Sequence, residues 1–191
     1  LKTLAKSGKT VRLVVDSRAG AEYLAKVMHG LPKPFEVVLD VDASVRLFGG
    51  LLHLGVRRSP LRSTYEISAC IDAILALPQL KLVGAMVYEA QIAGLQDRNP
   101  FTPFLNPIIK WIRKFSINRV ARRRLEVVRL FREKEIMLEL FNGGGSGSLN
   151  ISVLDPPLTE LSAGSGLLGP HLFDYYSNIS FHPALYFALP V

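Results

Sequence analysis

The sequence predicts an α/β fold with a mainly parallel sheet, and two observations support this prediction. Short apolar runs recur along the chain. They lack the alternation of apolar and polar residues that is typical of a strand with one exposed face. Most of them are followed by a longer segment with the apolar spacing of an amphipathic helix. Strands that are buried on both faces and separated by helices are typical of doubly wound folds and of (β/α)8 barrels, and both architectures fit. Strands are predicted at residues 11–15, 35–39, 80–87, 136–141, 158–162 and 185–191.

The strand count bears on the choice between these architectures. A complete barrel has eight strands and typically about 250 residues, whereas this chain has 191 residues and about six predicted strands. Either the sheet is open, or some strands of a barrel lie outside this chain. No internal repeat and no long linker divides the sequence, so residues 1–191 are expected to form one domain.

Capping signals predict the first two helices. Ser17 follows the first strand and can cap a helix. The inner face of this helix is expected to hold Tyr23, Leu24, Val27 and Met28. Ser63 and Glu66 form a capping-box pattern, and Pro78 ends the helix that it opens. The inner face of this second helix is expected to hold Ile67, Ile71, Ile74 and Leu75.

Composition limits the class of protein. Hydrophobic residues make up 49% and charged residues 20%, which excludes a disordered chain, and no apolar stretch is long enough to span a membrane. The single cysteine, Cys70, is expected to be buried in a reducing compartment, which favours the cytoplasm.

Most of the net charge of +7 comes from a basic helical region at residues 104–134. Its apolar residues are spaced to form one face, so we interpret the arginines as a solvated outer helix face. A nucleic-acid-binding helix is the alternative. The residues expected on the apolar face are Trp111, Ile112, Phe115, Val120, Leu125, Val128 and Phe131.

Polar residues follow several predicted strands, where parallel α/β folds collect their functional groups. Asp40, Asp42 and Arg46 follow the second strand and fit either a cofactor or metal site or a salt-bridged turn. Arg57 and its neighbour Arg58 fit an anion site or a basic loop. The third strand is followed by Tyr88 and Gln91, whose phenol and amide groups can hydrogen-bond a ligand.

The glycine-rich loop at residues 142–148 follows the fourth predicted strand. Glycines let backbone N–H groups approach a phosphate, and Ser146 adds a hydroxyl donor. A linker would have the same composition, but its position directly after a buried strand favours a phosphate cradle. The loop matches neither a Walker A nor a dinucleotide-binding pattern. A second small-residue turn at residues 159–166 precedes His171 and Asp174, a pair that we interpret as structural.

Taken together, these segments resemble the D-threonine aldolase and D-serine dehydratase-like family. The resemblance is strongest to its bacterial amino acid deaminase/aldolase branch, which shares the N-terminal barrel of alanine racemase. The segments that carry it are residues 42–46, 53–60, 88–94, 142–148 and 159–176. The resemblance implies a partial (β/α)8 TIM barrel of the type III pyridoxal-phosphate fold.

The resemblance also implies a set of residues that bind pyridoxal 5′-phosphate. A glycine-rich loop and a later turn would hold its phosphate, an arginine would point toward its ring, and a tyrosine and a glutamine would line the ring and the substrate. Arg57 is a rival for the arginine. The residues that match these positions are Arg46, Tyr88, Gln91, Gly144, Gly145, Ser146, Gly147 and Ser165.

Two features of the family are absent from the sequence. The family forms a Schiff base through a lysine in an Arg-Pro-His-x-Lys-Thr-His type motif, and no such motif occurs here. A C-terminal β domain, which supplies metal ligands in the aldolases and dehydratases, has no counterpart either. We therefore expect the first strands and the last domain to lie outside this chain. The chain alone is expected to have no catalytic residue, no metal site and no activity.

For the whole enzyme, the resemblance implies a lyase of the deaminase or aldolase type. Its substrate would be a small D- or β-hydroxy amino acid, and its partner a second copy in a homodimer. The alternative is a non-catalytic module that binds pyridoxal phosphate or another phosphate. Neither a nucleic acid nor a membrane is expected as a partner.

Overall fold

The computed structural model describes residues 2–189, which form two compact units. The first unit contains residues 2–42, 57–87 and 122–142, and the second contains residues 43–56, 88–121 and 143–189. The long helix α5 (Asn106–Glu133) contributes to both units.

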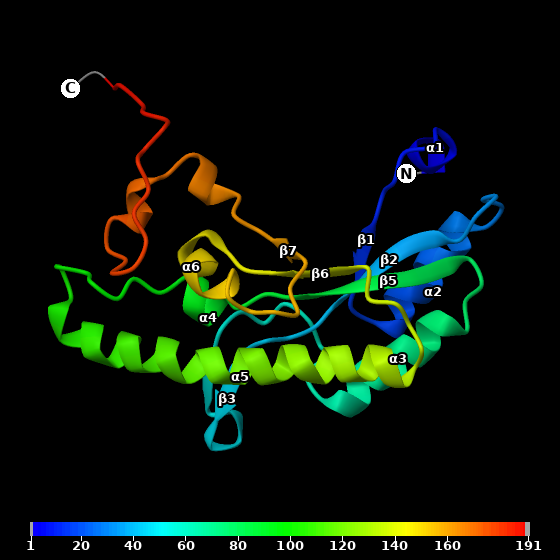
Figure 1. The fold of residues 1–191 in the computed structure, drawn as a ribbon, viewed down its shortest axis with the longest axis horizontal. Helices are drawn as coiled ribbons and strands as arrows, with labels where there is room; N and C mark the ends of the chain where they lie inside the picture. Colours follow the sequence, from blue (N-terminus) through cyan, green and yellow to red (C-terminus); the bar gives the residue numbers. More distant parts are fainter. Residues whose placement is uncertain (1, 190–191) are drawn as a thin grey trace. The chain divides into compact units, whose positions relative to one another are not determined.

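The first unit is built on a parallel sheet (Figure 1). β1 (Leu13–Val15) pairs with β2 (Phe35–Asp40), which pairs with β5 (Leu80–Val87), and both pairings are parallel. The next strand in the sheet is β6 (Leu140–Gly143). Gly84 lets β6 approach closely, because a Cβ there would lie 2.2 Å from the carbonyl oxygen of Leu140. The prediction of a parallel α/β sheet is confirmed.

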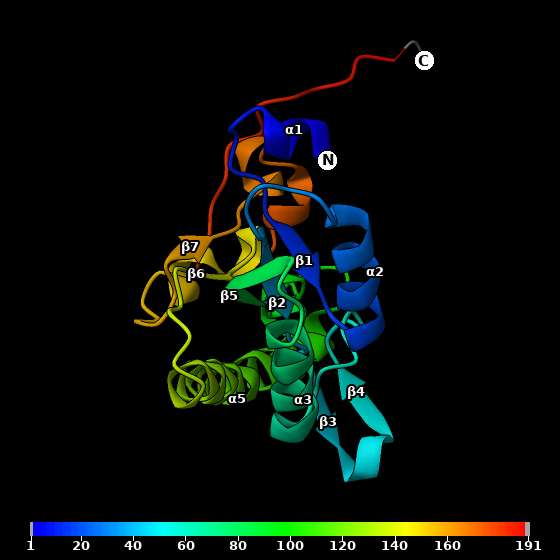
Figure 2. The same ribbon diagram turned by 90° about the vertical axis from the view of Figure 1, so that its right-hand side faces the viewer.

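Helices α2 (Arg18–Met28) and α3 (Thr64–Leu75) lie side by side in this unit, and α3 packs against β5 (Figure 2). Both predicted caps are present. Ser17 Oγ accepts from the N–H of Gly20, and Ser63 forms a full capping box with Glu66. A short helix, α1 (Lys2–Lys6), precedes β1.

The predicted inner faces of α2 and α3 are partly wrong. In α2, Tyr23 and Val27 are exposed, and the small residues Ala21 and Ala25 are buried instead. In α3, Leu75 is exposed. The buried face of each helix is therefore rotated from the predicted one, because close packing favours small residues where elements approach. The residues buried on these two faces are Ala21, Leu24, Ala25, Met28, Ile67, Cys70, Ile71 and Ile74.

The second unit consists mainly of short elements around the N-terminal half of α5. An antiparallel hairpin of β3 (Val45–Leu47) and β4 (Leu52–Leu54) turns through η1 (Phe48–Gly50) and was not predicted. The remaining elements are α4 (Ala90–Ala93), η2 (Pro103–Leu105), η3 (Ser146–Ser148), α6 (Leu149–Ser152), β7 (Glu160–Leu161), η4 (Ser165–Leu167) and η5 (His171–Phe173).

Three predicted strands need correction. The fourth, expected at residues 136–141, begins later, at Leu140. The fifth is reduced to Glu160–Leu161. The sixth was expected at residues 185–191, but residues 185–189 form no strand, and residues 190–191 lie outside the described residues.

The arginines of the basic helix α5 do not all lie on a solvated outer face, so this prediction is partly wrong. Arg113 and Arg124 are 5% and 3% exposed, whereas Trp111 and Leu125, which were expected on the apolar face, are more than half exposed. In the second unit, Arg113 Nη1 donates to the carbonyl of Leu95 at 2.7 Å. In the first unit, Arg124 Nη2 donates to the carbonyl of Val87 at 3.1 Å. These arginines are buried because backbone carbonyls accept their hydrogen bonds.

No helix in the described part of the chain is both long enough and apolar enough to cross a membrane.

Candidate functional site

The glycine-rich loop directly follows β6, as predicted, and belongs to the second unit from Gly143 onward. Every residue from Phe141 to Ser148 is buried, so the loop is not a solvated linker. Gly144 has a φ of +82°, which L side chains rarely adopt. Gly147 lies so close to α4 that a Cβ would be 1.9 Å from the carbonyl oxygen of Ala93. The sequence therefore needs glycine at these two positions for local geometry.

A buried acid, Glu89, lies beneath the loop, and the sequence reasoning missed it. Its side chain is buried, with 1% of the residue exposed. Glu89 Oε2 accepts from the N–H of Gly144 at 3.1 Å, and Oε1 accepts from Ser148 Oγ at 2.9 Å and also from Ser152 Oγ. Its position between Tyr88 and Gln91, at the end of a buried strand, is the signal that could have pointed to it.

The two loops that were predicted to share a phosphate lie together in the second unit. Ser146 Oγ is 3.1 Å from Ser165 Oγ and accepts from the N–H of Gly166 at 2.8 Å. Ser146 is buried, whereas Ser165 is exposed. Ser146 and Gly147 also begin η3, where the first N–H groups of a helical turn have no helical acceptor. This cluster of hydroxyl and N–H groups suits the oxygens of a phosphate.

Not all N–H groups of the loop are open to a ligand. The N–H of Gly144 is bonded to Glu89, and the N–H of Gly145 donates to Ser148 Oγ at 3.1 Å. The predicted nest of successive N–H groups is therefore partly used within the protein. The N–H of Gly166 is also used within the protein, on Ser146 Oγ, so the groups that fit a phosphate are the hydroxyls of Ser146 and Ser165 and the N–H groups that begin η3.

Tyr88 lies against the loop. A Cβ at Gly145 would be 2.9 Å from Tyr88 Cε2 and 3.5 Å from the phenol oxygen. Gln91 is buried, and its Nε2 donates to the carbonyl of Ala43 at 2.6 Å. Gln91 Oε1 is buried without a hydrogen-bond partner, which leaves an acceptor for a further donor.

The structure does not connect Arg46 to this cluster. Arg46 is exposed in β3, opposite His53 of β4, and its side chain makes no hydrogen bond or ion pair with the described residues. Its rival, Arg57, is also exposed and belongs to the first unit. The proposed role of an arginine near the cofactor ring stays a prediction.

The acids after β2 form salt bridges, which was one of the two readings left open. Arg58 Nε donates to Asp40 at 2.8 Å, and Arg62 Nε donates to Asp42 at 3.2 Å. Burial raises the pKa of Asp40, and this effect outweighs the lowering by the guanidinium of Arg58.

Arg113 supports the far end of the glycine loop. Its Nη2 donates to the carbonyl of Gly147 at 3.3 Å, and its Nη1 lies 3.7 Å from Asp97. Burial raises the pKa of Asp97, but hydrogen bonds from Ser177 and the charge of Arg113 outweigh it, so the net shift of this pKa is downward. Tyr176 lies below the guanidinium and donates to the carbonyl of Ala93 at 2.8 Å.

The described lysine side chains are all exposed or partly exposed, so none is buried against the loop. Within residues 2–189, no group of three or more His, Cys, Asp or Glu side chains could hold a metal ion. His171 and Asp174 form an exposed pair at 2.9 Å, and the exposure of this pair agrees with a structural role.

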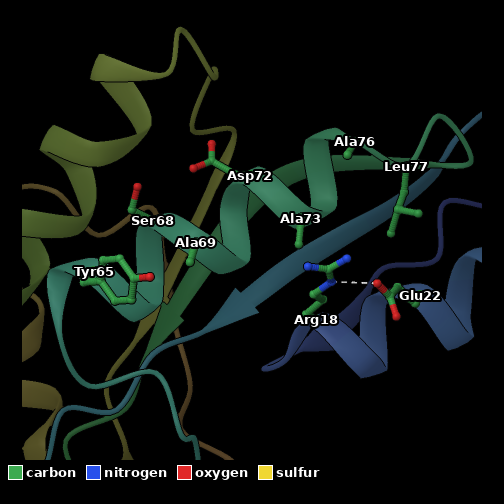
Figure 3. A pocket seen from close by; sticks show the side chains of 9 residues that line it. All are labelled: Arg18, Glu22, Tyr65, Ser68, Ala69, Asp72, Ala73, Ala76 and Leu77. Carbon is green, nitrogen blue, oxygen red and sulfur yellow. Dashed lines mark hydrogen bonds and ion pairs between the residues drawn. The ribbon is translucent and has the colours of Figure 1, made fainter.

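A groove of about 550 Å³ lies between α2 and α3 in the first unit (Figure 3). Ala69 and Ala73 of α3 and the ion pair of Arg18 with Glu22 on α2 line it. No residue predicted to bind the cofactor lines this groove.

The sequence matches no protein-family model and no curated protein. It does have structural neighbours. D-threonine aldolase from Filomicrobium marinum is 17% identical, with a TM-score of 0.72 over 96% of this chain and 44% of that chain. D-threo-3-hydroxyaspartate dehydratase from Delftia sp. HT23 is 17% identical, with a TM-score of 0.56 over 84% of this chain and 37% of that chain.

A third neighbour is alanine racemase from Bacillus anthracis, solved with bound L-Ala-P. It is 13% identical, with a TM-score of 0.61 over 95% of this chain and 40% of that chain. The chain thus spans less than half the length of these neighbours. The fold of this chain is part of an alanine racemase-like barrel, in agreement with the resemblance seen in the sequence.

Proposed function

We propose that this chain is the phosphate-binding part of a pyridoxal-phosphate-dependent enzyme that acts on a small amino acid. The observation that carries the proposal is the cluster of Ser146 Oγ, Ser165 Oγ and the N–H of Gly166, which joins two loops. The structural neighbours are pyridoxal-phosphate-dependent enzymes, which supports the choice of this phosphate compound.

In this role the chain binds and orients. The hydroxyls of Ser146 and Ser165 donate to phosphate oxygens, and the N–H groups that begin η3 add two donors. Tyr88 limits the space beside Gly145, and Gln91 Oε1 accepts from the ring or the substrate. When bound, pyridoxal phosphate acts as an electron sink for the charge that develops when a bond at the amino acid Cα breaks.

The finer assignment is a cytoplasmic lyase of the aldolase or deaminase type, acting on a D- or β-hydroxy amino acid. Its support is that two of the neighbours are a D-threonine aldolase and a D-threo-3-hydroxyaspartate dehydratase. In this assignment residues 1–191 form one part of a barrel. A further domain would supply any divalent metal ligands, and the whole enzyme would form a homodimer.

The alternative function is a non-catalytic module that binds pyridoxal phosphate or another phosphate. The observation that favours it is the exposure of the lysines whose side chains are described. Under both functions the 191-residue chain binds the phosphate but does not turn over an amino acid.

Equilibrium dialysis of the purified chain against pyridoxal phosphate tests the proposal. Pyridoxal, which lacks the phosphate, is the ligand control. Ser146→Ala removes the central hydroxyl and should weaken binding about tenfold or more, since a hydrogen bond to a charged group contributes about 1.5–3 kcal/mol. Ser180→Ala, at an exposed serine of the same unit, should leave binding unchanged.

Two results would contradict the proposal: no binding by the native chain, or equal binding of pyridoxal and pyridoxal phosphate. Borohydride treatment adds to this test. A covalent adduct on a lysine would support only the enzyme, whereas its absence is expected under both functions, because the motif of the Schiff-base lysine does not occur in this sequence.

A further inference from the structure

Glu89 is a buried acid for which the proposed binding groups give no role. Glu89 is 1% exposed and directly precedes α4. Its carboxylate accepts, among others, from the N–H of Gly144 and from the hydroxyls of Ser148 and Ser152. All three belong to the glycine-rich loop or to the helical turns directly after it. A buried carboxylate needs such donors, because without them its burial costs free energy.

These contacts fix the direction of the loop. Gly144 is in the left-handed region, with φ +82°, and its N–H faces Glu89. Ser148 links the next residue to the same acid, because its hydroxyl accepts from the N–H of Gly145 and donates to Glu89. Two successive N–H groups are therefore directed inward, toward the acid.

The next residue, Ser146, has a different set of partners. Its hydroxyl meets Ser165 Oγ and the N–H of Gly166. A loop without its inner contacts would sample other backbone directions, since four of its five residues at 143–147 are glycines. The order of the phosphate cluster thus depends on an inner acceptor.

We propose that Glu89 is a positioning residue that holds the glycine-rich loop in the conformation that presents Ser146 to a phosphate monoester. The identity of this ligand rests on the proposed function. The ordering of the loop by Glu89 does not, and it can be measured without any ligand.

Amide hydrogen exchange of the ligand-free chain, read by NMR, tests the proposal. Glu89→Ala should speed exchange at Gly144 and Gly145 at least tenfold relative to the amides of β2, which lie in the first unit. Glu89→Gln should stay within about threefold of the native chain, because its amide oxygen still accepts from Gly144 and the serine hydroxyls can rotate.

Asp174→Ala is the control. Asp174 is an acid of the same unit whose side chain pairs with His171 and not with the glycine-rich loop. This variant should leave the exchange of Gly144 within about threefold of native. Ser152→Ala removes one donor to Glu89 and should show a smaller increase in exchange than Glu89→Ala, so the test survives if Glu89→Ala does not fold.

The second readout is equilibrium dialysis with pyridoxal phosphate. Glu89→Ala should weaken binding at least tenfold, and Glu89→Gln should restore most of it. The proposal is wrong if Glu89→Ala leaves Gly144 protected, if Glu89→Gln exchanges as fast as Glu89→Ala, or if Asp174→Ala opens the loop equally. If the native chain binds no pyridoxal phosphate, the proposed function fails, while the exchange data still decide the role of Glu89.

Discussion

Replacing Gly147 by alanine should be among the most damaging single changes in the second unit. A Cβ at this position would lie 1.9 Å from the carbonyl oxygen of Ala93 and 2.7 Å from Tyr176 Cε1. Optimal contacts between non-bonded heavy atoms are near 3.5–4 Å, so the loop backbone must move away from α4. That movement would also strain or break the 3.3 Å hydrogen bond from Arg113 to the carbonyl of Gly147.

The expected loss follows from these two effects. Overpacking a well-packed site costs about 1–3 kcal/mol, and losing a hydrogen bond to a charged donor costs about 1.5–3 kcal/mol. The free energy of unfolding should therefore fall by about 3 kcal/mol, near the lower end of the sum of these two ranges, because the loop can shift away from α4. Gly164→Ala is the matched control, because no atom lies within 4 Å of a Cβ there and its φ of −53° is ordinary. It should change stability by less than about 1 kcal/mol.

Urea unfolding followed by tryptophan fluorescence gives the measurement. Trp111 is the single tryptophan, and it lies in the second unit, stacked on Phe115 at 5.2 Å. With a slope of about 1–3 kcal/mol per M, the Gly147→Ala midpoint should fall by about 1–3 M. A shift of less than about 0.5 kcal/mol, or an equal loss in Gly164→Ala, would refute the packing argument.

Three further predictions concern single side chains. Burial raises the pKa of the Cys70 thiol to about 11, so alkylation at pH 8 should be slow in the folded chain and fast in urea; equal rates would show that the thiol is exposed. Because Ser177 hydrogen bonds and a nearby guanidinium outweigh burial and lower the pKa of Asp97, its stabilising contribution is present at neutral pH and lost as pH falls through the lowered folded-state pKa. In Asp97→Asn the urea midpoint should fall less steeply with decreasing pH than in the native chain below about pH 4. An equally steep fall in both would contradict this. Ser63→Ala removes the capping box with Glu66 and should cost about 1 kcal/mol in thermal unfolding, whereas no loss would mean that the cap is replaced by solvent.

The sequence predicted elements best where one physical signal was sufficient. The strand at residues 80–87 was predicted to the residue, because a continuous apolar run is buried on both faces. The start of β6 was misplaced because apolarity does not show where pairing begins. The N–H of the residue before it, Glu139, donates to Val83 of β5, while its side chain forms a surface ion pair with Lys81.

The hairpin of β3 and β4 was missed although a signal was present. Gly49 and Gly50 have φ of +68° and +100°, and adjacent glycines between short runs favour a tight turn. The buried faces of the helices were partly mispredicted because alanine contributes little to a hydrophobic pattern. Alanine nevertheless packs well where two elements approach closely, as Ala21 and Ala25 do.

The candidate site was predicted in part. The family resemblance implied that the loop at Ser146 and the turn at Ser165 lie near the same phosphate, and the structure brings the two hydroxyl oxygens to 3.1 Å. Glu89 was missed because a charged residue at a strand end is usually predicted to be exposed. Its burial depends on donors 55–63 residues away in the chain, which no local pattern reveals.

The most direct test of the central claim is NMR mapping of backbone amides during titration with pyridoxal phosphate. We predict saturable shifts at Ser146, Gly147 and Gly166, with little change at Ala69 and Ala73 in the groove between α2 and α3. Inorganic phosphate should compete for the same amides. Shifts confined to that groove, or none at the glycine-rich loop, would contradict a phosphate site at this loop.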